Sequence, residues 1–157
     1  MSDAPSFPAR AAAVRRATAR LCLHLGWAPL HEVGLPNGRR ADILALRADG
    51  GFACIEIKSG ERDFLVDAKW PEYRDYADAL YFAVDADFPT AMLPQETGLI
   101  VAWDMGAEIL REAPAHPIAP ARRRALLHRF ANLGALRLAM LEDPGGAVEL
   151  RVGARAE

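Results

Sequence analysis

Three residues within one short stretch could do chemistry on a phosphate: Asp42, Glu56 and Lys58. Two carboxylates held close together can bind a hard divalent cation such as Mg²⁺, leaving positions for water and a phosphate. Such a cation lowers the pKa of bound water and neutralises charge that develops on phosphoryl oxygens. A lysine ammonium beside it can orient the attacking water or hold the phosphate. Together these residue types favour hydrolysis of a phosphodiester.

Two predicted strands and a tight turn must position these residues. Residues 40–47 and 52–58 are short, rich in Ile, Leu, Phe and Ala, and bounded by turn residues, as strands are. A three-residue loop over 48–50, with Gly50 in the left-handed conformation, is a common way to close a hairpin. The sequence therefore predicts an antiparallel hairpin here.

The register of this hairpin decides whether the charged side chains meet. With a three-residue loop, Asp42 falls opposite Glu56, and directly opposed residues share one face with their Cβ atoms about 5 Å apart. Lys58 lies two residues beyond Glu56 and so points to the same face. The other face is apolar and holds Ala41, Ile43, Ala45, Ala53, Ile55 and Ile57. Three charges gathered at one end of such a sheet favour a functional site.

An ion pair between Glu56 and Lys58 on a solvated sheet face is the competing interpretation, because ion-pair networks also bring opposite charges together. An acid-x-Lys triplet alone is a weak signal, since the chain contains a second copy, Asp67-Ala68-Lys69. That copy follows no predicted strand, and we interpret it as a solvated segment at the start of a helix. The apolar residues around Glu56 favour a functional reason for its charge, because burying charge is costly.

The order Asp42, thirteen residues, then Glu56-Ile57-Lys58 resembles the signature of the PD-(D/E)XK nuclease superfamily. The wider sequence closely resembles the MmcB-like DNA-repair proteins within it, through GRRADILAL, IEIKSGERDFLVDAKWPEYRDYADALYFAV and GLIVAWDMGAEIL. The likeness spans residues 8 to 112 and is most specific from Arg39 to Val84. It implies an α/β fold with a restriction-endonuclease-like core, a mixed β-sheet of four or more strands flanked by helices.

The resemblance also implies roles for residues of the hairpin. Asp42 and Glu56 would be metal ligands, the backbone carbonyl of Ile57 a further ligand, and Lys58 the catalytic lysine, with Mg²⁺ or Mn²⁺ as cofactor. The chain departs from the family pattern at Ala41, where the signature has a proline, a frequent relaxation. Many relatives also carry a metal-binding glutamate on the first helix, whereas residues 9–25 contain no acid.

Glu32 is the candidate to replace the missing helix acid as a metal ligand. It lies in a predicted strand over 28–35 that ends at Pro36-Asn37-Gly38. A two-residue turn at Asn37-Gly38 would point Glu32 to the wrong face, because a shift of one residue reverses the faces of a strand. A loop with an odd number of residues, or a bulge, would bring Glu32 to the face of Asp42.

DNA is the expected partner, with other repair proteins as further candidates. Because the net charge is −2, affinity for DNA must come from local patches. Arg39 and Arg40 precede Asp42 closely enough to meet a phosphate, or form an exposed pair at the start of a strand. On the last predicted helix, Arg122, Arg123 and Arg124 could contact the DNA backbone or be a solvated face. The same alternatives hold for the arginines of the first helix, Arg10, Arg15, Arg16 and Arg20.

Length and composition predict one folded domain over 1–157, with flexible tails at 1–7 and 144–157. A hydrophobic content of 52% and a charged content of 25% are ordinary for such a domain. No apolar run approaches the length of a membrane span, and the N-terminus lacks a signal-peptide core. Cys22 and Cys54 are expected to be buried thiols, which fits a reducing cytoplasm.

The remaining elements complete the predicted α/β fold. They are a helix over 8–25, a helix within 61–78, an interior strand over 79–84, a hairpin of 99–103 and 108–111, and a helix over 121–142. Pro114, Pro117 and Pro120 predict a stiff linker within the domain. The buried stripe of the last helix is expected to be Leu126, Phe130, Leu133, Leu136 and Met140.

The sequence thus favours metal-dependent hydrolysis of DNA phosphodiesters in repair. The alternative is a DNA-binding or scaffolding repair factor that keeps the nuclease fold but cleaves slowly or not at all. The three residues of the hairpin favour the enzyme, and the absence of an acid on the first helix favours the accessory protein.

Overall fold

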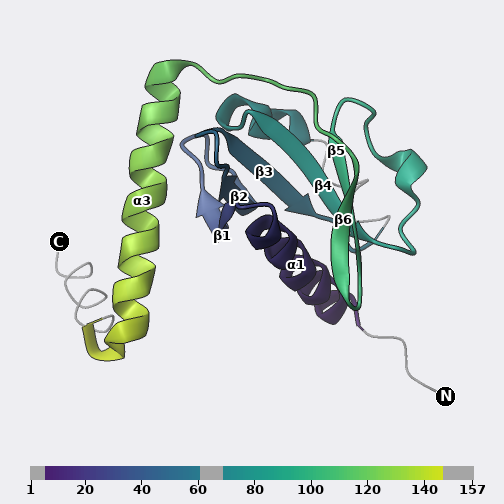
Figure 1. Cartoon of the computed structure of the whole chain (residues 1–157), viewed down its shortest axis with the longest axis horizontal. Helices are drawn as coiled ribbons and strands as arrows, with labels where there is room; N and C mark the ends of the chain where they lie inside the picture. The colour runs from purple at the N-terminus through teal and green to yellow at the C-terminus, as the bar shows by residue number, and fades with distance from the viewer. Residues whose placement is uncertain (1–5, 61–68, 147–157) are drawn as a thin grey trace. The chain divides into compact units, whose positions relative to one another are not determined.

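The computed structural model describes residues 6–60 and 69–146 (Figure 1). The chain divides into two compact units, Met1–Ala119 and Pro120–Glu157. The division falls at the prolines that were interpreted as a linker within one domain. A single domain over 1–157 therefore remains a prediction, and most residues of the predicted tails lie outside the described ranges.

A mixed sheet of six strands forms the first unit, with the strands side by side in chain order. They are β1 (Ala28–Gly34), β2 (Arg40–Leu46), β3 (Phe52–Ile57), β4 (Ala79–Asp85), β5 (Gly98–Trp103) and β6 (Gly106–Arg111). The first three form an antiparallel meander, β4 and β5 continue parallel to β3, and β6 is antiparallel to β5. The predicted α/β class with a mixed sheet is confirmed, and every predicted strand is present to within two residues.

Helix α1 (Phe7–His24) covers one face of the sheet (Figure 1). A proline lies in its first turn, and Gly26 follows its end with φ 75°, the left-handed conformation that favours glycine. The core beneath it includes Val14, Ala17, Cys22, Ile43, Ala45, Ala53, Ile55, Tyr81 and Ile100. The apolar face predicted for the hairpin is therefore the face that α1 buries.

The other face of the sheet carries a second core. Strand β4 is buried along almost its whole length, as expected for a parallel strand between two others. Phe82, Val84, Phe88, Leu93 and Leu99 cluster on this face. The 3₁₀ helix η1 (Trp70–Tyr76) packs here through the ring of Trp70, whose centroid is 6.3 Å from that of Phe82. A helix was predicted within 61–78, and the part at 61–68 lies outside the described residues.

The segment between β4 and β5 and the segment after β6 contain little regular structure. A short 3₁₀ helix, η2 (Thr90–Met92), lies between β4 and β5. After β6 the chain runs back to β4, where the N–H of His116 donates to the carbonyl of Asp78 at 2.8 Å. The N–H of Ile118 donates to Oδ1 of the same residue at 3.2 Å. The predicted linker is thus fixed to the first unit as far as Ile118.

The second unit contains α3 (Pro120–Glu142), which begins one residue before the predicted start. Leu136 was expected in the buried stripe, but this is wrong, because its side chain is 41% exposed. Leu127, Leu138 and Leu141 are also exposed, so leucines lie around the helix rather than along one stripe. Within the described residues, no helix is both long and apolar enough to span a membrane.

Candidate functional site

The turn between β2 and β3 sets the register of the site. Gly50 has φ 84°, the left-handed conformation that the sequence predicted. The N–H of Arg47 donates to the carbonyl of Gly51 at 2.8 Å, which closes a three-residue loop. Leu46 then pairs with Phe52 and Leu44 with Cys54. This is the predicted register, and it directs Asp42 and Glu56 to one face of the sheet.

Beyond this ladder, side chains replace the backbone pairing of β2 with β3. The last paired residues are Ile43 and Ile55. One step further, the N–H of Asp42 donates to Oε1 of Glu56 at 3.2 Å, and the N–H of Ile57 donates to Oδ2 of Asp42 at 2.8 Å. Each carboxylate thus accepts a hydrogen bond from the opposite strand, which fixes the two side chains in orientation and brings them together.

The end of β3 is also fixed from its other side. The N–H of Lys58 donates to the carbonyl of Ala83 in β4 at 3.0 Å, which continues the parallel pairing of β3 with β4. The ammonium-bearing side chain therefore starts from an anchored backbone. Lys58 is only 5% exposed and Glu56 only 3%, so both charged residues lie largely out of solvent.

Burial and mutual repulsion dominate the electrostatics of the carboxylates. Burial, and after it the negative charge of Asp42, raise the pKa of Glu56 to about 8, while Lys58 acts in the opposite direction. Cys54 lies beside them, with Sγ 3.8 Å from Oε1 of Glu56. Burial and the two acids raise the pKa of this thiol well above its ordinary value, so it stays protonated. A site with this charge distribution favours a cation or a proton.

The site opens into a hollow of about 640 Å³ on the protein surface. Its lining consists of Gly38, Arg39, Arg40, Asp42, Glu56, Ile57, Lys58 and Tyr73. Tyr73 is buried, but its hydroxyl reaches this wall and donates to the carbonyl of Arg40 at 3.3 Å. All four predicted residues of the hairpin therefore border one solvent-accessible space.

The two arginines at the mouth of the hollow differ. The Arg39 guanidinium is hydrogen-bonded to Oε2 of Glu72 in η1. The Arg40 side chain is exposed, and none of the acids in the described ranges forms an ion pair with it. Of the two, Arg40 is better placed to meet a phosphate, because binding one would break no ion pair with an acid of the described ranges.

Glu32 falls opposite Asp42 in the register of β1 with β2, but it is not grouped with the two carboxylates as a third metal ligand. The loop after β1 has an odd number of residues, because Gly34 pairs with Arg40 and the N–H of Leu35 donates to the carbonyl of Arg39. Glu32 falls between the paired residues His31 and Val33. Yet Glu32 has φ 50°, and its Oε1 lies 3.8 Å from Nη1 of Arg15 in α1. Among the described residues, no three acidic, histidine or cysteine side chains are grouped to hold a metal. The described site has two carboxylates.

Arg15, one of the first-helix arginines for which a phosphate contact or a solvated face was expected, is a neighbour of the site. A second hollow, of about 270 Å³, is bordered by Pro8, Ala11, Ala12, Arg15, Asp42, Ile57 and Ser59. It brings α1 next to Asp42 and Ile57, on the side where relatives are expected to carry an acid. The signal in the sequence for a basic residue beside the site was the composition of residues 9–25, which contain arginines and no acid.

The structure does not place the remaining predicted residues relative to the site. Arg122, Arg123 and Arg124 lie in the first turns of α3, which belongs to the second unit. Asp63 and Asp67, two acids of the segment over 61–78, fall outside the described residues. Lys69, the lysine of the second acid-x-Lys triplet, immediately precedes η1.

Comparison with known proteins gives a family and a structural neighbour. The sequence model of a family described as "DNA repair protein MmcB-like" matches residues 3–145. A protein of unknown function from Silicibacter pomeroyi, SPO1766, has a similar solved structure, with a TM-score of 0.84 and 39% sequence identity. The match covers 87% of this chain and 94% of that protein. None of the curated proteins matches the sequence.

Proposed function

This chain belongs to the MmcB-like family of DNA-repair proteins, and we propose that it is a metal-dependent hydrolase of DNA phosphodiesters. The observation that supports this most is the carboxylate pair at the end of β2 and β3. Asp42 and Glu56 each accept a backbone hydrogen bond from the other strand, next to the buried Lys58. An ordinary ion pair on a sheet face would need only one acid.

The donor set fits a hard divalent cation. Two carboxylates that repel each other, in a hollow open to solvent, are the ligands that Mg²⁺ and Mn²⁺ prefer. Asp42 and Glu56 would hold the ion, together with the backbone carbonyl of Ile57. When bound, the ion would lower the pKa of a water molecule and offset negative charge on the phosphate.

The chain's own residues divide the remaining work. Arg40 would bind a phosphate at the mouth of the hollow, with its carbonyl held by Tyr73. Lys58 would place a positive charge against the phosphoryl oxygens, where negative charge grows as the bond breaks. Because its side chain lies largely out of solvent, that charge is less screened than one on an exposed lysine. Asp42 and Glu56 would keep the ends of β2 and β3 aligned through the backbone hydrogen bonds that their carboxylates accept.

A binding or scaffolding role in repair is the second candidate, and one observation favours it. The described residues supply two carboxylates and place Arg15 on the α1 side of the site. A site with few acidic ligands binds a divalent cation weakly, because affinity depends on the number of charged ligands. In that case the hollow would bind DNA phosphates without cleaving them.

Single-turnover cleavage assays separate the two candidates. Single-stranded, nicked, flapped and branched DNA would each be incubated with the protein and either Mg²⁺ or Mn²⁺. We expect cleavage of a subset of these substrates, lost in Asp42→Asn and kept in Glu108→Gln, a control at an exposed acid of β6. If the wild-type protein binds DNA but cleaves none of the substrates with either metal, the binding role replaces the enzymatic one.

A further inference from the structure

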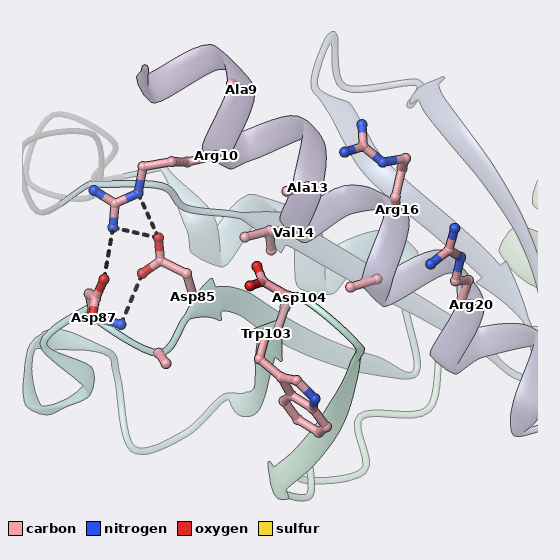
Figure 2. A pocket seen from close by; sticks show the side chains of 13 residues that line it. Ala9, Arg10, Ala13, Val14, Arg16, Arg20, Asp85, Asp87, Trp103 and Asp104 are labelled. Atoms are coloured by element: carbon pink, nitrogen blue, oxygen red, sulfur yellow. Dashed lines mark hydrogen bonds and ion pairs between the residues drawn. The ribbon is translucent and has the colours of Figure 1, made fainter. Parts of the chain in front are cut away.

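A third pocket, separate from the two hollows beside Asp42, lies between α1 and the ends of β4 and β5 (Figure 2). Its volume is about 580 Å³, within the range of small-molecule sites. The part of α1 that borders it includes Ala13, Arg16 and Arg20, whereas Ala12 and Arg15 face the carboxylate side. At 100° per residue the centres of these two sets lie about 100° apart around the helix, so the two sites border neighbouring faces of α1.

The charges at one end of this pocket are already neutralised. Nε and Nη2 of Arg10 donate to Oδ2 of Asp85 at 2.9 and 2.6 Å, and Nη2 also lies 3.8 Å from Asp87. The N–H of Asp87 donates to Oδ1 of Asp85 at 3.2 Å. Figure 2 shows this network on the side of the pocket nearest the start of α1. It fixes the wall but leaves little charge there for a ligand.

The middle of α1 contributes two arginines of a different kind. Arg16 and Arg20 are four residues apart, so their side chains are neighbours on one helix face. Both are exposed, and neither forms an ion pair or hydrogen bond with any residue in the described ranges. Two neighbouring guanidinium groups with unused donors, on the wall of a pocket, are suited to bind one phosphate.

The opposite wall supplies an aromatic ring and a hydrogen-bond acceptor. Trp103 ends β5 and its side chain is 46% exposed, although tryptophan normally buries most of its surface. Asp104 follows it, and Figure 2 shows its carboxylate between the wall of α1 and the end of the strand. An exposed indole can stack with a base, and a carboxylate can accept hydrogen bonds from amino or hydroxyl groups.

From this arrangement we propose that the pocket binds a nucleoside monophosphate unit. The phosphate contacts Arg16 and Arg20, the base stacks on Trp103, and Asp104 accepts a hydrogen bond from the base or sugar. Asp104 disfavours a di- or triphosphate, because each added phosphate brings more negative charge towards this acid. The unit belongs either to a free nucleotide or to a single strand of DNA, and these sources share the same chemistry.

NMR of the tryptophan indole groups tests the site directly. The three indole N–H resonances of Trp27, Trp70 and Trp103 would be assigned with Trp103→Phe, and dAMP would be added with EDTA present. We expect millimolar dAMP to shift the Trp103 resonance and leave those of Trp27 and Trp70 in place. Inorganic phosphate or deoxyadenosine alone should bind at least about 10-fold more weakly, since each makes only part of the contacts.

Arginine variants test the phosphate contacts, and a short single-stranded oligonucleotide tests whether the ligand is a free nucleotide or DNA. Arg16→Gln with Arg20→Gln should weaken dAMP binding about 10-fold or more, whereas Arg129→Gln, an exposed arginine of α3, should not change it. A short oligo-dA that binds about 10-fold more tightly than dAMP assigns the site to single-stranded DNA, and equal affinity assigns it to free nucleotides. The proposal is overturned if dAMP leaves the Trp103 resonance unmoved, or if the double arginine variant binds dAMP as the wild type does. Because EDTA removes metal, neither result depends on DNA cleavage.

Discussion

Two buried carboxylates in the same sheet show how differently the fold treats an acid. Asp78, just before β4, is 6% exposed, and Glu56, in β3, is 3% exposed. The Oδ2 of Asp78 accepts a hydrogen bond from the N–H of Phe52 at 2.7 Å, and its Oδ1 accepts one from Ile118 at 3.2 Å. Glu56 instead faces a second acid, Asp42, which raises its pKa.

The difference lies in what surrounds each acid. Backbone N–H groups from two distant segments stabilise the charge of Asp78, and in return Asp78 joins β3, β4 and the chain after β6. Glu56 has a thiol, one N–H and a like charge as neighbours, together with Lys58. Burial alone therefore does not mark a functional acid in this protein. The balance of donors and like charges around it does.

Removing each carboxylate should give opposite stability effects, and this is the largest effect that we expect. Asp78→Ala leaves two buried N–H groups without an acceptor, and should lower the free energy of unfolding by about 4 kcal/mol. Glu56→Gln keeps an acceptor for the N–H of Asp42 and removes the cost of protonating Glu56 on folding, so it should raise the free energy of unfolding at neutral pH. Urea denaturation at neutral pH without metal measures both. Equal losses in the two variants would remove the contrast between the acids.

Lys58→Ala should separate catalysis from binding. The loss of one electrostatic contact to the reacting phosphate is expected to lower the single-turnover cleavage rate about 100-fold. Affinity for DNA should change little, because one positive charge among several phosphate contacts is lost. Lys69→Ala, in the second acid-x-Lys triplet, is the matched control and should cleave as the wild type does.

The basic helix should show the reverse pattern. Neutralising Arg122, Arg123 and Arg124 together should weaken DNA binding and leave cleavage within bound complexes intact. Each lost phosphate contact should reduce the slope of log affinity against log salt by about 0.9. A triple variant with the wild-type affinity and slope would show that these arginines are only a solvated face.

The sequence predicted the part of the site that local geometry determines. One left-handed glycine, Gly50, fixes the loop length, and the loop length fixes which residues of β2 and β3 face each other. Nothing more distant is needed to bring Asp42 and Glu56 together. The same local reasoning explains why the strands were located to within two residues.

Other parts of the site depend on distant contacts and could not be predicted in this way. The loop after Glu32 has the odd number of residues that was expected to direct it to the site. Its left-handed backbone conformation and its ion pair with Arg15 of α1 could not be inferred from that loop. The role of Asp78 depends on Ile118, forty residues along the chain. The hydroxyl of Tyr73 reaches the carbonyl of Arg40 only because of the path of η1.

The pH dependence of stability should also reveal the acid pair, through a smaller change in the free energy of unfolding. Glu56 has a pKa of about 8 in the folded chain, against an ordinary value of 4.5. Between these values the folded chain holds a proton that the unfolded chain has released, so stability falls as the pH rises. Each pH unit in this window should lower the free energy of unfolding by about 1.4 kcal/mol when EDTA is present. Glu56→Gln should flatten this slope, and a wild-type slope that is already flat would contradict the raised pKa.

Direct binding of Mn²⁺ tests whether Asp42 and Glu56 form a cation site. The wild-type protein would be titrated with Mn²⁺ while electron paramagnetic resonance measures the free ion, alongside Asp42→Asn and Glu108→Gln. We expect the wild type and Glu108→Gln to bind the ion and Asp42→Asn to lose this binding, because one of the two charged ligands is gone. Equal binding of Mn²⁺ by Asp42→Asn and the wild type would contradict the account.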